Sequence, residues 1–282
     1  ILLLEKQKET DHYQIQSLPI NSGVFCLKKD RFQDVVWIGT DGQGVYLYSN
    51  PLYSIKSMVL SNYTEKIERP VRAIYLDDER TFWVGTKGNG ILKIYDYEFD
   101  KNISDCRAEV LTTSNSALSS NAVYCFAKSH RNLLWIGDEE GLTYYSYREK
   151  RIKSIPIRIG NEDFKYIHDI YETADSELWL ASVGMGVVKA RIAGTPDNPV
   201  IVDAQRYIIN DGELGSNYFF TIYAENEANL LFGNKGYGVF RYNETTNGLE
   251  PVSTHKYENM TLNNILAISK DCSNNYLFGT SY

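Results

Sequence analysis

The chain has 282 residues, a formal net charge of -7 at pH 7 and an isoelectric point near 5.2. This acidic balance argues against nucleic acid as a partner, because that binding needs clustered lysine and arginine side chains. No apolar run reaches the roughly 18 residues of a membrane span, and the opening apolar stretch is too short for a signal-peptide core. We therefore expect an internal piece of a longer protein, with no membrane segment in this part.

A short apolar motif recurs six times along the chain at intervals of 44 to 52 residues. Its copies are Val36-Trp37-Ile38-Gly39, Phe82-Trp83-Val84-Gly85, Leu134-Trp135-Ile136-Gly137, Leu178-Trp179-Leu180-Ala181, Leu230-Leu231-Phe232-Gly233 and Tyr276-Leu277-Phe278-Gly279. All four tryptophans of the chain fall in one column of this alignment. A fixed period of this length is typical of repeat architectures.

Each repeat contains four β-rich runs separated by turn residues, a spacing that favours an all-β fold over alternating strands and helices. In the second repeat these runs cover 71–76, 81–85, 90–95 and about 106–112. A single small sheet with two apolar faces must bury both of them, and a ring of such sheets does so. The pattern predicts a β-propeller of four-stranded antiparallel blades, with about six blade equivalents.

The expected domain is a single propeller, or a fragment of one, over residues 1–282. Residues 2–7 and 11–16 resemble third and fourth strands, and 262–282 resembles first and second strands, so we expect five intact blades and one split blade. The two remnants either close a six-bladed ring or are torn edges of a seven-bladed ring. The predicted blades cover about 18–60, 61–112, 113–158, 159–209, 210–257, and 258–282 together with 1–17.

Two columns of the repeat are assigned structural roles. The tryptophans are predicted to lie between blades, and the recurring glycines of the connections 39–44, 85–90 and 233–238 are attributed to hairpins that need positive φ. A third column, at the third position of the first strand, holds small residues such as Cys26 and Cys125, which should crowd around the axis. The structural assignments are Trp37, Trp83, Trp135, Trp179, Gly39, Gly85, Gly137, Gly233 and Gly279.

No local catalytic or metal-binding motif occurs in the sequence. The four histidines, His12, His130, His168 and His255, lie in different repeats without the spacing of metal ligands. Sialidase-type boxes and the serine nucleophile elbow are missing as well. Carboxylates from different blades could still converge into an acid/base pair. We predict no catalytic residue, no metal and no cofactor.

Ligand-binding candidates are side chains that break the apolar pattern where the first strands begin, near the expected mouth of the ring. Aromatic faces and planar polar groups of this kind suit a sugar. Several have a structural alternative: Asn121 and Asn217 would cap turns, Tyr124 and Tyr218 would fill space between blades, and Arg72 would pair with an acid such as Asp169. The candidates are Arg69, Arg72, Asn121, Tyr124, Lys165, Tyr166, His168, Asn217 and Tyr218.

The segment Leu118-Ser119-Ser120-Asn121-Ala122-Val123, followed by Leu134-Trp135-Ile136-Gly137, resembles the two-component regulator propeller repeat. That family is typical of periplasmic sensor regions of hybrid two-component systems in Bacteroidetes, many of which respond to oligosaccharides. Its propellers are often seven-bladed and duplicated, and a β-sandwich, a membrane helix and a histidine kinase follow them. The chain departs from the repeat at Ala181, Leu231 and Leu277.

The resemblance implies a periplasmic ligand-sensing and scaffold propeller, with an oligosaccharide ligand and with kinase activity elsewhere in the protein. The implied partners are other domains of the same sensor and a second subunit. Two other functions stay open: a protein-interaction ring without a small ligand, and a glycan-degrading enzyme.

Overall fold

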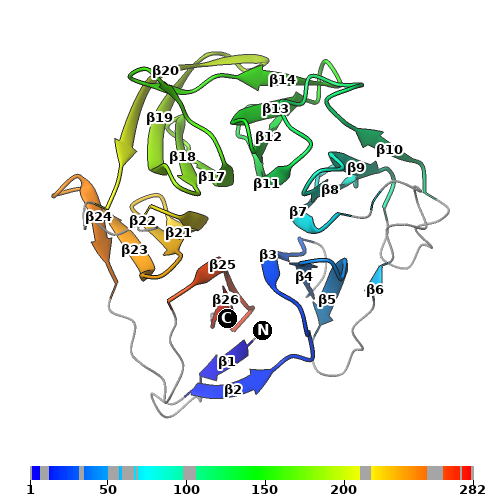
Figure 1. The fold of residues 1–282 in the computed structure, drawn as a ribbon, viewed down its shortest axis with the longest axis vertical. Coiled ribbons are helices and arrows are strands. Elements are labelled where there is room, and N and C mark those ends of the chain that lie inside the picture. The colour runs from blue at the N-terminus through cyan, green and yellow to red at the C-terminus, as the bar shows by residue number, and fades with distance from the viewer. Residues whose placement is uncertain are drawn as a thin grey trace.

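The computed structural model shows an all-β ring whose sheets radiate from a central axis (Figure 1). It describes residues 2–6, 13–31, 35–49, 57–58, 67, 69–97, 106–209, 217–252, 263–273 and 275–280. These residues form six four-stranded antiparallel sheets and one two-stranded sheet, with no helix in this part of the chain. The predicted β-propeller of four-stranded antiparallel blades is confirmed.

Five blades are each built from consecutive strands, and the first strand of each blade is nearest the axis (Figure 1). Blade 1 contains β3 (Val24–Lys29), β4 (Val35–Thr40), β5 (Val45–Ser49) and β6 (Ser57–Met58); blade 2 contains β7 (Val71–Leu76), β8 (Phe82–Thr86), β9 (Ile91–Ile94) and β10 (Ala108–Leu111); blade 3 contains β11 (Val123–Lys128), β12 (Leu133–Asp138), β13 (Leu142–Ser146) and β14 (Arg151–Ile155). Blade 4 contains β17 (Ile167–Glu172), β18 (Glu177–Ser182), β19 (Gly186–Thr195) and β20 (Asn198–Tyr207); blade 5 contains β21 (Phe219–Asn226), β22 (Asn229–Asn234), β23 (Gly238–Asn243) and β24 (Gly248–Pro251). The two-stranded sheet of β15 (Arg158–Ile159) and β16 (Glu162–Asp163) lies in the connection between blades 3 and 4.

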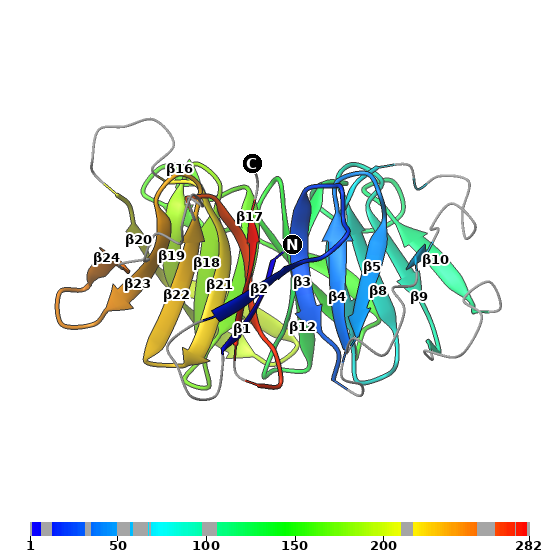
Figure 2. The same ribbon diagram turned by 90° about the horizontal axis from the view of Figure 1, so that it is seen from below.

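Blade 6 combines strands from both ends of the described chain. Its order is β2-β1-β26-β25, with β25 (Ile265–Lys270) and β26 (Tyr276–Thr280) inside and β1 (Leu2–Lys6) and β2 (Tyr13–Ser17) outside. The join is the antiparallel pairing of Leu2 with Phe278. Each inner strand contacts the inner strands of both neighbouring blades, including β25 with β3 and with β21. The two remnants that the sequence predicted therefore meet in one sheet (Figure 2).

The tryptophan column lies in the seams between blades, as predicted. The four indoles are at most 4% exposed. Trp37 lies 5.1 Å from Phe82 of blade 2, and Trp83 lies 4.9 Å from Tyr145 of blade 3, measured between ring centroids. Three indole N–H groups also donate to buried carboxylates: Trp37 to Asp30 at 2.8 Å, Trp83 to Asp77 at 2.9 Å and Trp135 to Glu172 at 2.6 Å. The seams at these three tryptophans therefore combine apolar burial with a satisfied indole donor.

The predicted positive φ is confirmed for the glycines inside the hairpins, but the glycines that directly follow the tryptophan column have another cause. A Cβ added at Gly39 would lie 2.4 Å from the sulfur of Cys26, and one at Gly137 would lie 2.4 Å from the sulfur of Cys125. Both glycines face the column of small residues on the inner strand, so no space is left for a side chain. Positive φ is instead found in the hairpins that follow, at Gly42, Gly44, Gly88, Gly90, Gly184, Gly186, Gly236 and Gly238.

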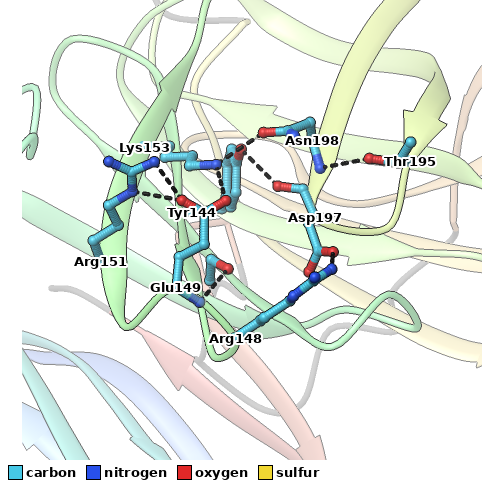
Figure 3. A network of polar contacts seen from close by, with 9 residues as sticks. Tyr144, Arg148, Glu149, Arg151, Lys153, Thr195, Asp197 and Asn198 are labelled. Atoms are coloured by element: carbon cyan, nitrogen blue, oxygen red, sulfur yellow. Dashed lines mark hydrogen bonds and ion pairs between the residues drawn. The ribbon is translucent and has the colours of Figure 1, made fainter.

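A polar network joins the outer strands of blades 3 and 4 (Figure 3). Tyr144 Oη donates to the Asp197 carbonyl at 3.3 Å, and Arg148 pairs with the Asp197 carboxylate at 2.5 Å. Lys153 Nζ donates to Asn198 Oδ1 at 2.8 Å. These contacts hold the turn between β19 and β20 against blade 3. Exposed pairs of this kind contribute little stability each, so the network mainly orients the two blades.

Candidate functional site

Every inner strand contains a β-bulge at the same place, between its first and third residues. A bulge leaves one residue out of the ladder and redirects its side chain. Five of the six bulge residues line a cavity of about 50 Å³ on the axis. The sixth, Arg72, lies over the ring of Phe25, which is one of those five. We call these six residues the collar. They are Phe25, Arg72, Tyr124, His168, Phe220 and Leu266.

The collar side chains pack on one another across the blade seams. The ring of His168 stacks on Tyr124 at 4.2 Å between centroids and meets Phe220 edge-on at 5.1 Å. The Arg72 guanidinium lies over the Phe25 ring at 3.1 Å from its centroid. A cavity of 50 Å³ holds one or two waters and is too small for a sugar ring. The collar therefore closes the channel at this end.

Burial controls the charges in the collar. It is the first cause that lowers the pKa of His168 to about 3, and the positive charges of Arg72 and Lys87 add to the effect. Burial also raises the pKa of Tyr124 to about 12, and Glu139 adds to that rise. The ring of His168 and the hydroxyl of Tyr124 are thus both neutral at pH 7. Arg72 carries the charge of the collar, although burial lowers its pKa.

The pairing of Arg72 with Asp169, which was one structural alternative, is not what the structure shows. The Asp169 carboxylate accepts hydrogen bonds from Thr221 Oγ1 at 3.0 Å and from the Ile222 backbone N–H at 2.7 Å. These bonds join β17 to β21 across a blade seam. Arg72 lies on Phe25 instead, because cation–π contact suits a guanidinium that has lost much of its water.

Three of the nine predicted ligand residues, Arg72, Tyr124 and His168, therefore come together in the collar. Asn121 and Asn217 serve the backbone: Asn121 Oδ1 accepts from Thr113 N at 2.9 Å, and Asn217 Oδ1 accepts from Ile209 N at 2.7 Å. Their carbonyls also accept from two hairpin glycines of the preceding blade, which are Gly88 and Gly90 for Asn121 and Gly184 and Gly186 for Asn217.

The remaining predicted residues contact the hairpins between second and third strands; they are Arg69, Lys165, Tyr166 and Tyr218. Lys165 Nζ pairs with Glu140 at 2.5 Å. Tyr166 has φ of 54° and is 42% exposed. The ring of Tyr218 covers Gly184, where an added Cβ would meet it at 3.3 Å. Ligand contact by the nine residues stays a prediction.

A space large enough for a ligand lies at the opposite end of the inner strands. There, β3, β7, β11 and β17 and the turns that follow them surround a cavity of about 550 Å³, which we call the wide pocket. Its volume is in the usual range for small-molecule sites. It adjoins the narrow cavity, since Lys28 and Phe126 line both. The polar and aromatic side chains that line it include Lys28, Arg31, Tyr75, Lys128, His130 and Tyr171.

Salt bridges hold several of these side chains in place. Arg31 pairs with Asp78 at 2.6 Å and donates to Tyr75 Oη at 2.9 Å. Lys128 reaches the other oxygen of Asp78 at 2.5 Å. Asp78 thus connects residues of blades 1, 2 and 3 at the edge of the wide pocket. The arrangement offers aromatic faces beside cationic donors, which suits a polar, oxygen-rich ligand.

Sequence reasoning missed Phe25, Phe220 and Leu266 of the collar and the whole wide pocket. The available signal was the fifth position of each inner strand, which holds Lys28, Tyr75 and Tyr171 in three blades and breaks the apolar pattern there. Among the described residues, no group of three or more histidine, cysteine or acidic side chains is placed to hold a metal. His12 and His255 lie outside the described residues.

Solved structures with the same fold include extracellular domains of bacterial signalling proteins. The extracellular domain of the putative hybrid two component system BT3049 from B. thetaiotaomicron has a TM-score of 0.64 and 20% identity, over 95% of this chain and 33% of that chain. The corresponding domain of BT4673 from the same organism has a TM-score of 0.58 and 15% identity, over 99% of this chain and 43% of that chain. The chain thus spans less than half of either structure, and the likeness is one of fold.

Sequence comparisons add little. No protein-family model matches the chain. Translation initiation factor 6 of Saccharolobus solfataricus is 31% identical over 140 residues, which cover 45% of this chain and 57% of that protein. The chain therefore spans just over half of that relative, and its activity is not carried over. In the part of the chain that the structure describes, no helix has the length and apolar character of a membrane span.

Proposed function

We propose that the chain is a ligand-sensing and scaffold propeller from the periplasmic input region of a hybrid two-component sensor histidine kinase. The observation that carries the proposal is the wide pocket of about 550 Å³, which adjoins the narrow cavity lined by the collar through Lys28 and Phe126. The shared fold with extracellular domains of putative hybrid two component systems supports the sensory role. Kinase activity would belong to another part of the protein.

In this proposal an oligosaccharide enters the wide pocket and lies against Tyr75 and Tyr171. Both tyrosines occupy the fifth position of an inner strand, on β7 and β17. The pocket is bounded by four consecutive blades, so a bound ligand would change how those blades pack. A change of that kind shifts the equilibrium between two arrangements of propellers or subunits, which is how the signal would reach the kinase.

The test is a thermal-shift screen of the chain against neutral and acidic oligosaccharides. A ligand that binds only the folded state raises Tm by mass action. Tyr171→Ala should weaken the response several-fold. Tyr223→Ala is the matched control, because Tyr223 holds the same fifth position on β21 but does not line the wide pocket. A panel in which no saccharide raises Tm would refute saccharide sensing by this chain.

A protein-interaction ring is the second candidate, and one observation favours it. Strand β20 is ten residues long, forms the outer edge of blade 4, and carries Val200 and Val202 at 49% and 51% exposure. Long edge strands with exposed apolar side chains can pair with another chain. Sedimentation of wild type beside Val200→Lys/Val202→Lys would reveal self-association. A reducing-end assay with polysaccharides separates both candidates from a glycan-degrading enzyme.

A further inference from the structure

We propose that the wide pocket contains an anion-binding subsite built on Lys28, which takes the carboxylate or sulfate group of an acidic saccharide. This inference rests on the proposed function and names the chemical class of its ligand. Four cationic side chains line the pocket against two carboxylates, although the whole chain carries a net charge of -7. The cations are Lys28, Lys29, Arg31 and Lys128, and the carboxylates are Asp30 and Glu172.

The two carboxylates are already committed to other donors. Asp30 accepts the indole N–H of Trp37 at 2.8 Å and is 9% exposed. Glu172 accepts the indole N–H of Trp135 at 2.6 Å and is 4% exposed. Both acids keep their negative charge, because an indole N–H is a neutral donor, so the lysine, arginine and acidic side chains of the lining sum to a formal charge of +2. Glu172 also lies 3.7 Å from Arg131 Nε, which offsets part of its charge. A ligand would therefore still meet a net positive lining.

Lys28 differs from the other cations because it lies where the two cavities join. It lines both the wide pocket and the narrow cavity, and its residue is half-buried. Burial raises the pKa of Cys26 to about 11 and that of Cys125 well above its ordinary value, and the positive charge of Lys28 opposes the rise at both thiols. Lys28 is on the inner strand of blade 1 and Cys125 is on the inner strand of blade 3. The positive charge of Lys28 is therefore felt by a thiol of a blade that is not its neighbour.

The ammonium group of Lys28 has no hydrogen bond or ion pair with any residue that the structure describes. Arg31 and Lys128, by contrast, share Asp78 at 2.6 and 2.5 Å. A half-buried ammonium that pairs with none of the described carboxylates gains most from an anionic ligand, because the pair forms where water is limited. The sugar ring that carries the anion would then lie toward Tyr75 and Tyr171.

The experiment is isothermal titration of the chain with two matched pairs of probes: digalacturonate beside its methyl ester, and 6′-sulfolactose beside lactose. Inorganic sulfate is titrated separately. At least one acidic probe should bind about ten-fold more tightly than its neutral counterpart, and Lys28→Gln should abolish that preference. Lys28→Arg keeps the positive charge and should retain the preference for the acidic probe. Lys150→Gln removes an exposed cation outside the pocket and should bind as wild type does.

The outcomes separate the two proposals. If neutral and acidic probes bind equally, or if Lys28→Gln retains the preference in a folded variant, the anion subsite is refuted while saccharide sensing stands. If sulfate binds in a Lys28-dependent way but no saccharide does, the subsite stands and saccharide sensing fails. If nothing binds, both are overturned. Raising the salt from 50 to about 300 mM should weaken the acidic probes alone, because a partly exposed ion pair is screened.

Discussion

Trp135 Nε1 donates a 2.6 Å hydrogen bond to Glu172 Oε2 across the seam between blades 3 and 4. In blades 1 and 2 the indole acceptor comes from the same blade, from Asp30 and Asp77, each just after its inner strand. Blade 3 has Ser129 at the corresponding place, so the next blade supplies the carboxylate. The substitution turns a contact within one blade into a link between two.

Glu172→Ala should therefore destabilise the fold strongly. The side chain is 1% exposed, and Oε1 lies 3.7 Å from Arg131 Nε, an ion-pair distance too long for a hydrogen bond. Removing it leaves the half-buried Arg131 guanidinium without its carboxylate partner and the indole N–H of Trp135 without its acceptor, at a cost of about 3–5 kcal/mol. Tm in a thermal melt should fall by on the order of 10 °C.

Two companion variants make that test specific. Glu172→Gln keeps an oxygen for the Trp135 N–H and should lose less stability than Glu172→Ala. Glu177→Ala breaks the more exposed pair of Glu177 with Lys189, which spans 2.9 Å, and should change stability by about 1 kcal/mol or less. Equal losses for Glu172→Ala and Glu177→Ala would contradict a structural role for the seam carboxylate.

Gly39→Ala should destabilise the chain by about 1–3 kcal/mol, because the new methyl group would lie 2.4 Å from the sulfur of Cys26. The double variant with Cys26→Ala should recover part of that loss in urea denaturation, since the other neighbours of Gly39 are 3.6 Å away or more. Gly248→Ala is the control, with its nearest neighbour at 3.8 Å. No recovery in the double variant would show that backbone conformation, rather than space, requires the glycine.

His168 should make stability depend on pH. Its pKa is about 3 in the folded protein, against 6.5 ordinarily, so the unfolded chain takes up the proton first as the pH falls. The stabilising contribution of neutral His168 is complete above about pH 6.5 and is lost as the pH falls toward 3. The Tm of His168→Phe minus the Tm of wild type should therefore be larger at pH 4.5 than at pH 7.5. Phe220→Leu changes the collar without a titrating group, and its pH profile should parallel that of wild type.

Asp169→Ala should cost about 1–3 kcal/mol, because it leaves the Ile222 N–H without its 2.7 Å acceptor at a blade seam. Thr221→Val removes only the weaker 3.0 Å hydrogen bond and should cost about 1 kcal/mol. Since both bonds end on one carboxylate oxygen, the double variant should lose less than the two single losses added together. Strict additivity in urea melts would mean that the two contacts act independently.

The blades themselves could be predicted because their determinants are local and repeated. A tryptophan such as Trp83 is followed by a glycine such as Gly85 in three repeats, and related apolar motifs at the same spacing in the other three make the period visible. The small residues at Cys26 and Cys125 likewise indicated crowding at the axis. The cause of the glycines was misjudged, because a Cβ clash between neighbouring strands is invisible until those strands are paired.

The wide pocket was decided by the tertiary structure alone. A strand pattern shows that Lys28 and Tyr171 interrupt the apolar alternation, but their residues are 143 positions apart and meet only when four blades stand around one axis. The six bulges add a further step that alternation cannot predict, since each one redirects a side chain such as His168 into the channel. The sequence by itself thus determined the blade and its packing, because these depend on short-range periodicity. Ring geometry determined which end of the inner strands has the narrow cavity and which has the wide pocket, because that depends on side chains converging from separate repeats.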